Sequence, residues 1–192
     1  MEDQLFEFIA KYMPLLEEEK KAIIDLAIFK SFKKGTVLLK EGELSKDGYF
    51  VLKGCLRTYY VIEGEEKTTA FYTESDSFAP LCIVTNKPSE LYISCVEDSM
   101  VLVNNPEIDQ IMFQKFPRFE TLCRILSEEL VAKNQASFDD FKTSSPKQRY
   151  LNLLKTRPEL LQRVPQHQLA SFLGMKPESL SRIRKRLLVE AK

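Results

Sequence analysis

The sequence predicts an α+β protein, in which an antiparallel, strand-rich segment lies between N-terminal helices and a helical C-terminal part. Residues 28–103 hold short runs of β-branched and aromatic residues, separated by glycine-containing turns. Residues 118–140 place apolar side chains three or four positions apart, which predicts one long helix. Residues 164–186 predict two short helices joined at Gly174, the second of them strongly basic.

The composition is that of a folded soluble protein. Of 192 residues, 44% are hydrophobic and 29% are charged, whereas disordered chains combine low hydrophobicity with high net charge. No run approaches the roughly 20 apolar residues of a membrane-spanning helix. The acidic start, Met-Glu-Asp-Gln-Leu-Phe, is unlike a signal peptide. We therefore expect a cytoplasmic protein without a membrane partner.

Charge is divided unevenly along the chain, although 28 basic and 28 acidic residues cancel overall. Residues 144–192 hold 11 Lys and Arg against 3 Asp and Glu, a charge of +8. That leaves 17 basic (28 − 11) and 25 acidic residues (28 − 3) in residues 1–143, a charge of −8. The asymmetry predicts that the C-terminal part alone meets a polyanion.

The residue types needed for metal or catalytic chemistry are sparse. Cys55, Cys82, Cys95 and Cys123 form no CxxC pair, so we expect free thiols rather than a zinc or iron–sulfur site. A metal-dependent β-barrel enzyme needs two or three histidines, and this sequence has one, His167. The regularly placed glycines fit tight turns, because no phosphate-binding glycine pattern is present. We predict no enzyme activity, catalytic residue, metal or cofactor.

The elements follow in order from the N-terminus. Leu5, Ile9 and Tyr12 recur at helical spacing, and residues 15–26 form a second amphipathic segment. Strands are predicted next, and their near-regular spacing favours an antiparallel barrel or sandwich. The predicted strands are residues 36–39, 49–52, 55–62, 67–72, 91–96 and 100–103.

The long helix has two possible partners. Asn105-Pro106-Glu107 opens a preceding helix and Pro117 breaks it. The apolar face of residues 118–140 packs either on the barrel or against the same helix of a second chain, and we expect a homodimer. The expected interface residues are Phe119, Leu122, Leu126 and Leu130. Thr143-Ser144-Ser145-Pro146 then forms a hinge and the cap of the next helix.

The two helices around Gly174 combine a small core with a basic outer face. Leu169, Ala170 and Leu173 are placed to meet Leu180, Ile183 and Leu187. The opposite face of the second helix predicts binding in a DNA groove, although a solvated basic helix is the alternative. The residues expected to contact double-stranded DNA are Lys176, Glu178, Ser179, Ser181, Arg182, Lys185 and Arg186.

The chain resembles the Crp/Fnr family of bacterial transcription regulators over nearly its whole length. The pattern Gly35-x6-Gly42-x5-Gly48-Tyr-Phe-Val-Leu-Lys-Gly54-x-Leu-Arg carries the resemblance in the strand region. Ser-Pro-Lys-Gln-Arg-Tyr-Leu and Pro-Glu-Ser-Leu-Ser-Arg are similar to a subgroup common in Bacteroidetes. The resemblance implies a jelly-roll-like β-roll related to cyclic nucleotide-binding domains in residues 1–105. It further implies a dimerisation helix in 106–142 and a helix-turn-helix domain in 143–192.

The resemblance also assigns roles. The family's recognition helix carries Glu-x-x-x-Arg, matched by Glu178 and Arg182, which are thereby expected to read bases. The basic residue that often precedes this Glu is replaced by Pro177, and the β-hairpin wing that usually follows the recognition helix is expected to be absent. RNA polymerase is a partner that the resemblance leaves open.

Cyclic AMP is not expected to bind. Family members that bind it use a Gly-Glu pair and, about ten residues later, an Arg-Ser pair. Here Pro80 replaces the acid, and Ser89 or Glu90 replaces the Arg. Lys87 is a poorer phosphate clamp. The pocket is either vestigial or holds an unknown effector, with ordinary core packing as the alternative. The candidate lining residues are Phe71, Phe78, Leu81, Glu90, Tyr92 and Cys95.

A binding module rather than a DNA regulator is the rival interpretation. Such a protein would sense a nucleotide or another small molecule and act through protein partners. Binding to a palindromic DNA duplex separates the two possibilities.

Overall fold

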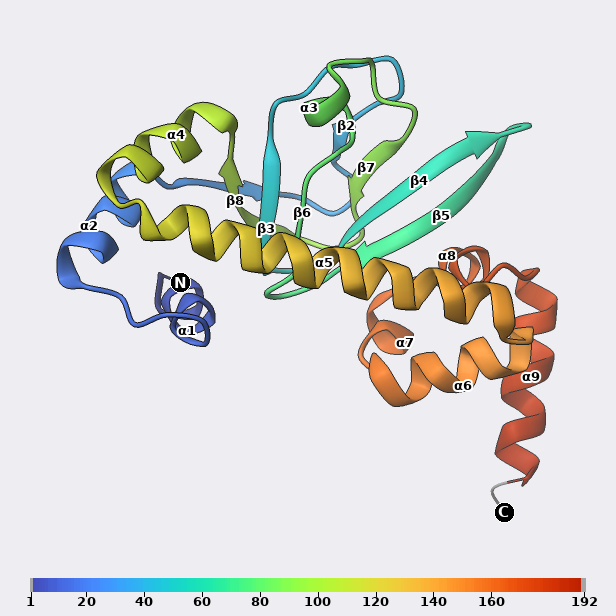
Figure 1. The fold of residues 1–192 in the computed structure, drawn as a ribbon. Coiled ribbons are helices and arrows are strands. Elements are labelled where there is room, and N and C mark those ends of the chain that lie inside the picture. Colours follow the sequence, from blue (N-terminus) through green and yellow to red (C-terminus); the bar gives the residue numbers. More distant parts are fainter. Residues whose placement is uncertain (1, 191–192) are drawn as a thin grey trace.

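Two antiparallel sheets flanked by helices and a helical C-terminal part make up the protein (Figure 1). This computed structural model describes residues 2–190. The N-terminal helices and strands are α1 (Glu2–Ala10), α2 (Glu17–Leu26), β1 (Ile28–Phe32), β2 (Val37–Leu39), β3 (Gly48–Lys53), β4 (Leu56–Ile62), β5 (Glu65–Tyr72), β6 (Ser77–Phe78), α3 (Cys82–Thr85), β7 (Tyr92–Cys95) and β8 (Ser99–Asn104). The helices that follow are α4 (Pro106–Lys115), α5 (Arg118–Thr143), α6 (Pro146–Thr156), α7 (Leu160–Arg163), α8 (Gln166–Phe172) and α9 (Pro177–Glu190).

The strands form two four-stranded sheets, in the orders β1-β8-β3-β6 and β2-β7-β4-β5, with antiparallel pairing throughout. The prediction of an antiparallel strand region is therefore confirmed. Three elements of this region were not predicted, namely β1, β6 and α3. A strand of two residues and a helix of four are too short to show a hydrophobic period. The residues filling the space between the sheets are Leu39, Tyr49, Val51, Leu56, Phe78, Cys82, Ile93, Cys95, Val101 and Val103.

The turn from β3 to β4 requires glycine. Gly54 has φ +102°, and a Cβ there would lie 2.6 Å from the Cα of Ser99. Both constraints exclude a larger residue, because a side chain disfavours positive φ and this site has no space. The close approach also leaves the amide and carbonyl of Gly54 free to bond Glu74 and Arg163.

The N-terminal helices cover the outer face of the first sheet together with α5. Leu5 and Ile9 of α1 share a buried cluster with Phe50 and Leu52 of β3. The cluster also contains Phe119 and Leu122, each 5% exposed.

The predicted dimer interface is therefore wrong at Phe119 and Leu122, which are buried within their own chain. The helical period correctly marked an apolar face, but that face packs on α1 and β3. The other two predicted residues, Leu126 and Leu130, are half-buried. Large apolar side chains on the open side of α5 are instead Val131, 68% exposed, and Phe138, 57% exposed.

The C-terminal helices surround a second core. The predicted packing of α8 against α9 is confirmed: Leu169, Ala170, Leu173 and Leu180 are buried, and Ile183 and Leu187 pack against them. The same cluster includes residues of the strand region, Cys55, Phe71 and Val96. The C-terminal helices are thus docked on the second sheet of the same chain, where β5 lies against α8 (Figure 1).

Membrane-spanning length and apolarity are not found in any helix of residues 2–190. Within the same residues, no group of His, Cys, Asp or Glu is arranged to hold a metal ion.

Candidate nucleic-acid interface

The corner between α8 and α9 is fixed by Gly174. Its φ is +66°, and a Cβ there would lie 2.9 Å from Cζ of Phe141 on α5. The Arg149 guanidinium lies over the same Phe141 ring, 4.3 Å from its centroid. The corner is therefore packed against the end of the long helix, and a side chain there would require the Phe141 ring to move.

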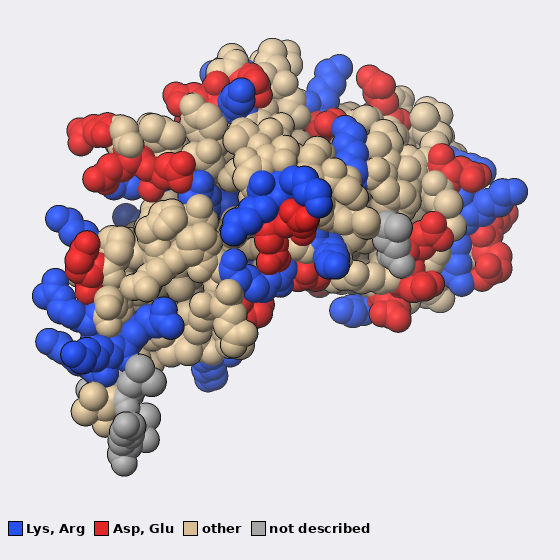
Figure 2. Space-filling model, turned by 180° about the vertical axis from the view of Figure 1, so that it is seen from behind, with Lys and Arg blue, Asp and Glu red and all other residues tan. Residues whose placement is uncertain are grey.

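One side of α9 is anchored and the other faces solvent. Leu180 is fully buried against α8. Glu178, in the first turn, is exposed, and its negative charge interacts favourably with the positive end of the helix dipole. Of the predicted DNA contacts, Ser179 is half-buried and the others are exposed, namely Lys176, Glu178, Ser181, Arg182, Lys185 and Arg186. Figure 2 shows a blue group of Lys and Arg side chains over this part of the molecule.

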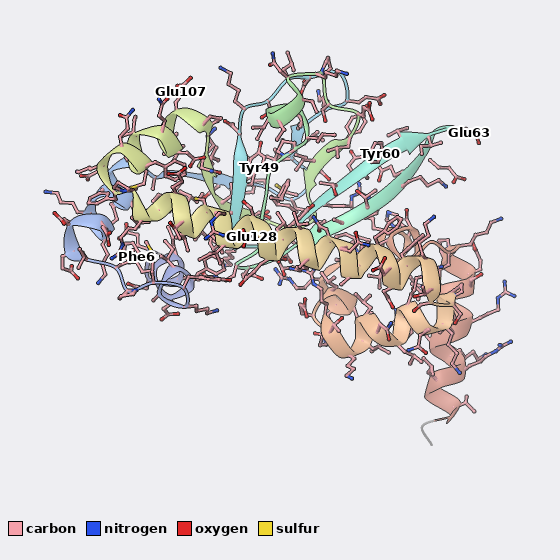
Figure 3. The ribbon with its side chains drawn as sticks, in the orientation of Figure 1. Phe6, Tyr49, Tyr60, Glu63, Glu107 and Glu128 are labelled. Atoms are coloured by element: carbon pink, nitrogen blue, oxygen red, sulfur yellow. The ribbon has the colours of Figure 1, made fainter. Side chains whose placement is uncertain are left out.

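The helix before the corner is held by polar contacts. The Ser171 hydroxyl donates to the Glu66 carbonyl at 3.0 Å and accepts from the Thr68 amide at 2.9 Å. These bonds fix α8 to the β4–β5 hairpin, whose tip at Glu63 projects beyond the sheets (Figure 3). His167, at the start of α8, is exposed.

Part of the C-terminal positive charge faces inward. Arg157 hydrogen-bonds Thr73 and forms an ion pair with Asp76, and Arg163 pairs with Glu74 and Glu97. These two guanidiniums are neutralised by the strand region, so the charge of +8 overstates what is available to a polyanion. Partners more than 60 positions away in sequence could not be foreseen from the charge count.

The predicted effector residues do not line one cavity. Phe78 lies between the sheets, where its ring stacks on Tyr72 with centroids 3.9 Å apart. Phe71 lies on the outer face, edge-on to Phe172 of α8, and Tyr92 stacks on Tyr59. Leu81 is 68% exposed, and Glu90 is exposed. Phe71 and Phe78 belong to two different apolar clusters, which fits the alternative of ordinary core packing.

The segment equivalent to the cyclic AMP cassette satisfies its own polar groups. The Ser89 hydroxyl donates to the Leu91 carbonyl at 2.9 Å, and the Ser89 amide donates to the Glu43 carbonyl at 2.8 Å. Pro80 is buried, and Lys87 is exposed. The predicted replacements therefore build a loop closed by backbone bonds.

An apolar cavity of about 370 Å³ lies between the N-terminal helices, the first sheet, α4 and α5. Leu126, Leu130 and Cys123 contribute to its wall, with Asp109 at one side. Burial raises the pKa of Asp109, partly offset by a hydrogen bond from Asn104, and burial raises the pKa of the Cys123 thiol to about 11. Sequence reasoning missed this cavity because its wall comes from segments distant in sequence.

Residues 29–115 match the family model of the cyclic nucleotide-binding domain. The strand region is therefore similar to this type of domain. The match leaves α5 and the helices after it outside. No curated protein sequence matches the chain.

Solved structures of Crp/Fnr regulators resemble this one over most of its length. FixK2 from Bradyrhizobium japonicum has a TM-score of 0.71 and 17% identity, covering 86% of each chain. The c-di-GMP responsive global regulator CLP of Xanthomonas campestris has a TM-score of 0.69 and 15% identity, covering 91% of this chain and 92% of its own. A CooA variant from Carboxydothermus hydrogenoformans has a TM-score of 0.68 and 15% identity, covering 88% and 79%. This likeness supports a mixed fold of antiparallel sheets, like that of cyclic nucleotide-binding domains, with a long helix.

Proposed function

We propose that the protein is a DNA-binding transcription regulator of the Crp/Fnr type that binds a palindromic operator as a dimer. The packing of α9 supports this most directly: a glycine corner and the buried Leu180 hold the helix, and its basic side remains open. In this proposal residues 1–105 form the sensor domain, 106–142 join the chains and 143–192 form the DNA-binding domain.

Base reading is assigned to Glu178 and Arg182, which are both exposed and lie four positions apart on α9. Residues at this spacing share one helix face. Arginine grips guanine through two hydrogen bonds, and glutamate accepts one from cytosine. Phosphate contacts, which supply affinity without sequence choice, are assigned to the remaining exposed groups. These groups are Lys176, Ser179, Ser181, Lys185 and Arg186.

Dimerisation is assigned to the open side of α5, with Val131 and Phe138 at its centre. The two residues lie seven positions apart, so they recur on one face of the helix as in a two-stranded coiled coil. Pairing would place two α9 helices about 34 Å apart, the spacing of successive major grooves.

The test is selection of bound duplexes from a random library, followed by affinity measurements with single variants. Arg182→Ala should cost about 1–3 kcal/mol and relax preference at one base pair. Lys185→Ala should weaken all duplexes alike and reduce the salt dependence. Lys21→Ala, an exposed lysine on α2, is the matched control and should leave binding unchanged. Failure to enrich any duplex would contradict the proposal.

The match to a cyclic nucleotide-binding domain favours a second function, nucleotide sensing through protein partners. We propose instead that cyclic AMP does not bind this domain. Phe78 and Tyr72 fill the space between the sheets, and Pro80 and Ser89 supply neither the acid nor the arginine that cyclic AMP requires. Calorimetry is expected to show no binding, whereas low-micromolar affinity together with no DNA binding would establish the rival function.

A further inference from the structure

The turn of residues 73–76, which joins β5 to β6, is tightly fixed. The Ser75 amide donates to the Val51 carbonyl at 2.9 Å, and the Val51 amide donates to the Asp76 carbonyl at 2.9 Å. The Asp76 carboxylate accepts from the Thr73 amide at 2.9 Å. Ser75 has φ +69°, a left-handed conformation that these bonds maintain.

Two arginines of the C-terminal helices hold this turn. Arg163 at the end of α7 donates to Glu74 at 2.7 Å and to the Gly54 carbonyl at 2.9 Å. Arg157, between α6 and α7, donates to the Phe71 carbonyl and the Thr73 hydroxyl, each at 2.9 Å. Its guanidinium also reaches Asp76 at 3.2 Å. Each planar guanidinium thus spans backbone and carboxylate acceptors at once, which fixes its orientation.

The long helix reaches the same turn. Lys133 of α5 lies 2.8 Å from one carboxylate oxygen of Asp76, while Arg157 approaches the other oxygen. Asp76 therefore joins the strand region, the long helix and the C-terminal helices at one side chain.

These ion pairs are partly shielded from water. The side chains of Arg157, Arg163 and Asp76 are 24%, 23% and 17% exposed. Beside them, Phe71 packs on Phe172 in the apolar cluster that spans the two parts of the chain. Partly buried pairs are screened less by salt than surface pairs. Hydrogen bonds to Glu74 are the main cause of the raised pKa of Arg163.

We infer that the turn of residues 73–76 is a latch that sets the direction of α9 relative to the strand region of the same chain. Arg157 and Arg163 are then positioning residues for DNA binding, although neither lies on the exposed face of α9. Asp76 immediately precedes β6 and the cassette segment, so a displacement there reaches α9 through two guanidiniums as well as along α5. The inference about DNA rests on the proposed function, whereas the latch itself does not.

The first measurement needs no DNA. Spin labels at Lys40→Cys and Lys155→Cys, both exposed, report the distance between the strand region and α6 in a Cys123→Ser background. Labelled chains are diluted with unlabelled chains, so that distances within one chain dominate. The parent protein should give one narrow distance distribution, and Arg157→Ala with Arg163→Ala should broaden it. An unchanged distribution would overturn the latch.

The second measurement is the affinity of the same variants for a selected duplex. The double variant should bind about tenfold more weakly, within the usual range of coupling between sites. Lys20→Ala, which breaks a surface pair with Glu17 on α2, is the matched control. Arg163→Lys keeps the positive charge but loses the planar guanidinium that bonds several acceptors at once. Its distance distribution and its DNA affinity should lie between those of the parent and the double variant. Asp76→Asn, which preserves side-chain shape, replaces the double variant if that variant does not fold.

The outcomes separate the two proposals. A broadened distribution in the double variant, together with a parent protein that binds no duplex, supports the latch and contradicts the proposed function. A broadened distribution with unchanged DNA affinity overturns the positioning role of the arginines.

Discussion

Gly174, like Gly54, is subject to two constraints, a positive φ and a close contact at the Cβ position. Both Gly174 and Gly64 have positive φ, +66° and +79°, but a Cβ at Gly64 would meet nothing within 4 Å. The difference in stability between alanine variants at the two positions therefore reports the contact with Phe141. At Gly174, both the backbone conformation and the packing against Phe141 oppose a side chain.

Gly174→Ala should therefore destabilise the protein more than Gly64→Ala. The positive φ alone costs roughly 1–3 kcal/mol for a residue with a side chain, and the clash at 2.9 Å adds to it. Denaturant unfolding of the two variants measures both effects. Equal losses would show that Phe141 moves aside without cost.

Glu74 gives the latch a dependence on pH. Burial alone would raise its pKa, but hydrogen bonds from Arg163 and from the backbone amides of Glu74 and Gly54 lower it below 4.5. A lowered pKa in the folded state stabilises the protein above pH 4.5, and this contribution is lost as the pH falls through the folded pKa.

The difference in unfolding free energy between the parent and Glu74→Gln should be largest above pH 4.5 and shrink below it. Unfolding at a series of pH values measures that difference, with Glu120→Gln on α5, an exposed residue, as the control. A difference that stays constant from pH 6 to pH 3 would contradict the assignment.

At the scale of elements, α5 serves two surfaces along its length. Its first turns, with Phe119 and Leu122, complete the core beneath α1, and its middle exposes Val131 and Phe138. The sequence pattern identified an apolar helix face but could not say which partner covers it. That distinction depends on where the N-terminal helices fold back, which is a long-range property of the chain.

Phe138→Glu should convert the proposed dimer to monomer with little loss of monomer stability, because 57% of the residue is exposed. Phe119→Ala should do the reverse, costing about 3–5 kcal/mol of stability through a buried cavity while leaving chain association intact. Sedimentation and thermal unfolding distinguish these effects. If Phe119→Ala dissociates the chains and Phe138→Glu does not, the interface lies at the residues predicted from the sequence and not at Phe138.

Local patterns were predicted well and distant contacts were not. The helical spacing of Leu169, Leu173 and Leu180 correctly gave the core of the two-helix unit, because each partner lies within a dozen residues. Residues such as Phe71 were misplaced, since a strand pattern does not show which sheet face meets another element. The ion pairs of Arg157 and Arg163 could not be predicted from the sequence either, because their partners are distant: Arg157 and Thr73 are 84 positions apart.

At the scale of the whole molecule, the strand region and the C-terminal helices share one apolar cluster. Two regions joined in this way should unfold together. Calorimetry of the parent is expected to show one transition, and Arg157→Ala with Arg163→Ala should separate it into two. Two transitions in the parent would indicate that the shared cluster contributes little.

Substitutions at Gly54 should disturb contacts that lie far from it in the sequence. Its carbonyl accepts from Arg163, 109 positions later, and its amide donates to Glu74. A bulky replacement would displace both groups, yet Gly54 lies in neither the cassette segment nor α9. If the protein regulates genes as proposed, a screen for mutants that have lost this control should recover changes at the strand turn of Gly54, far from the proposed DNA contacts.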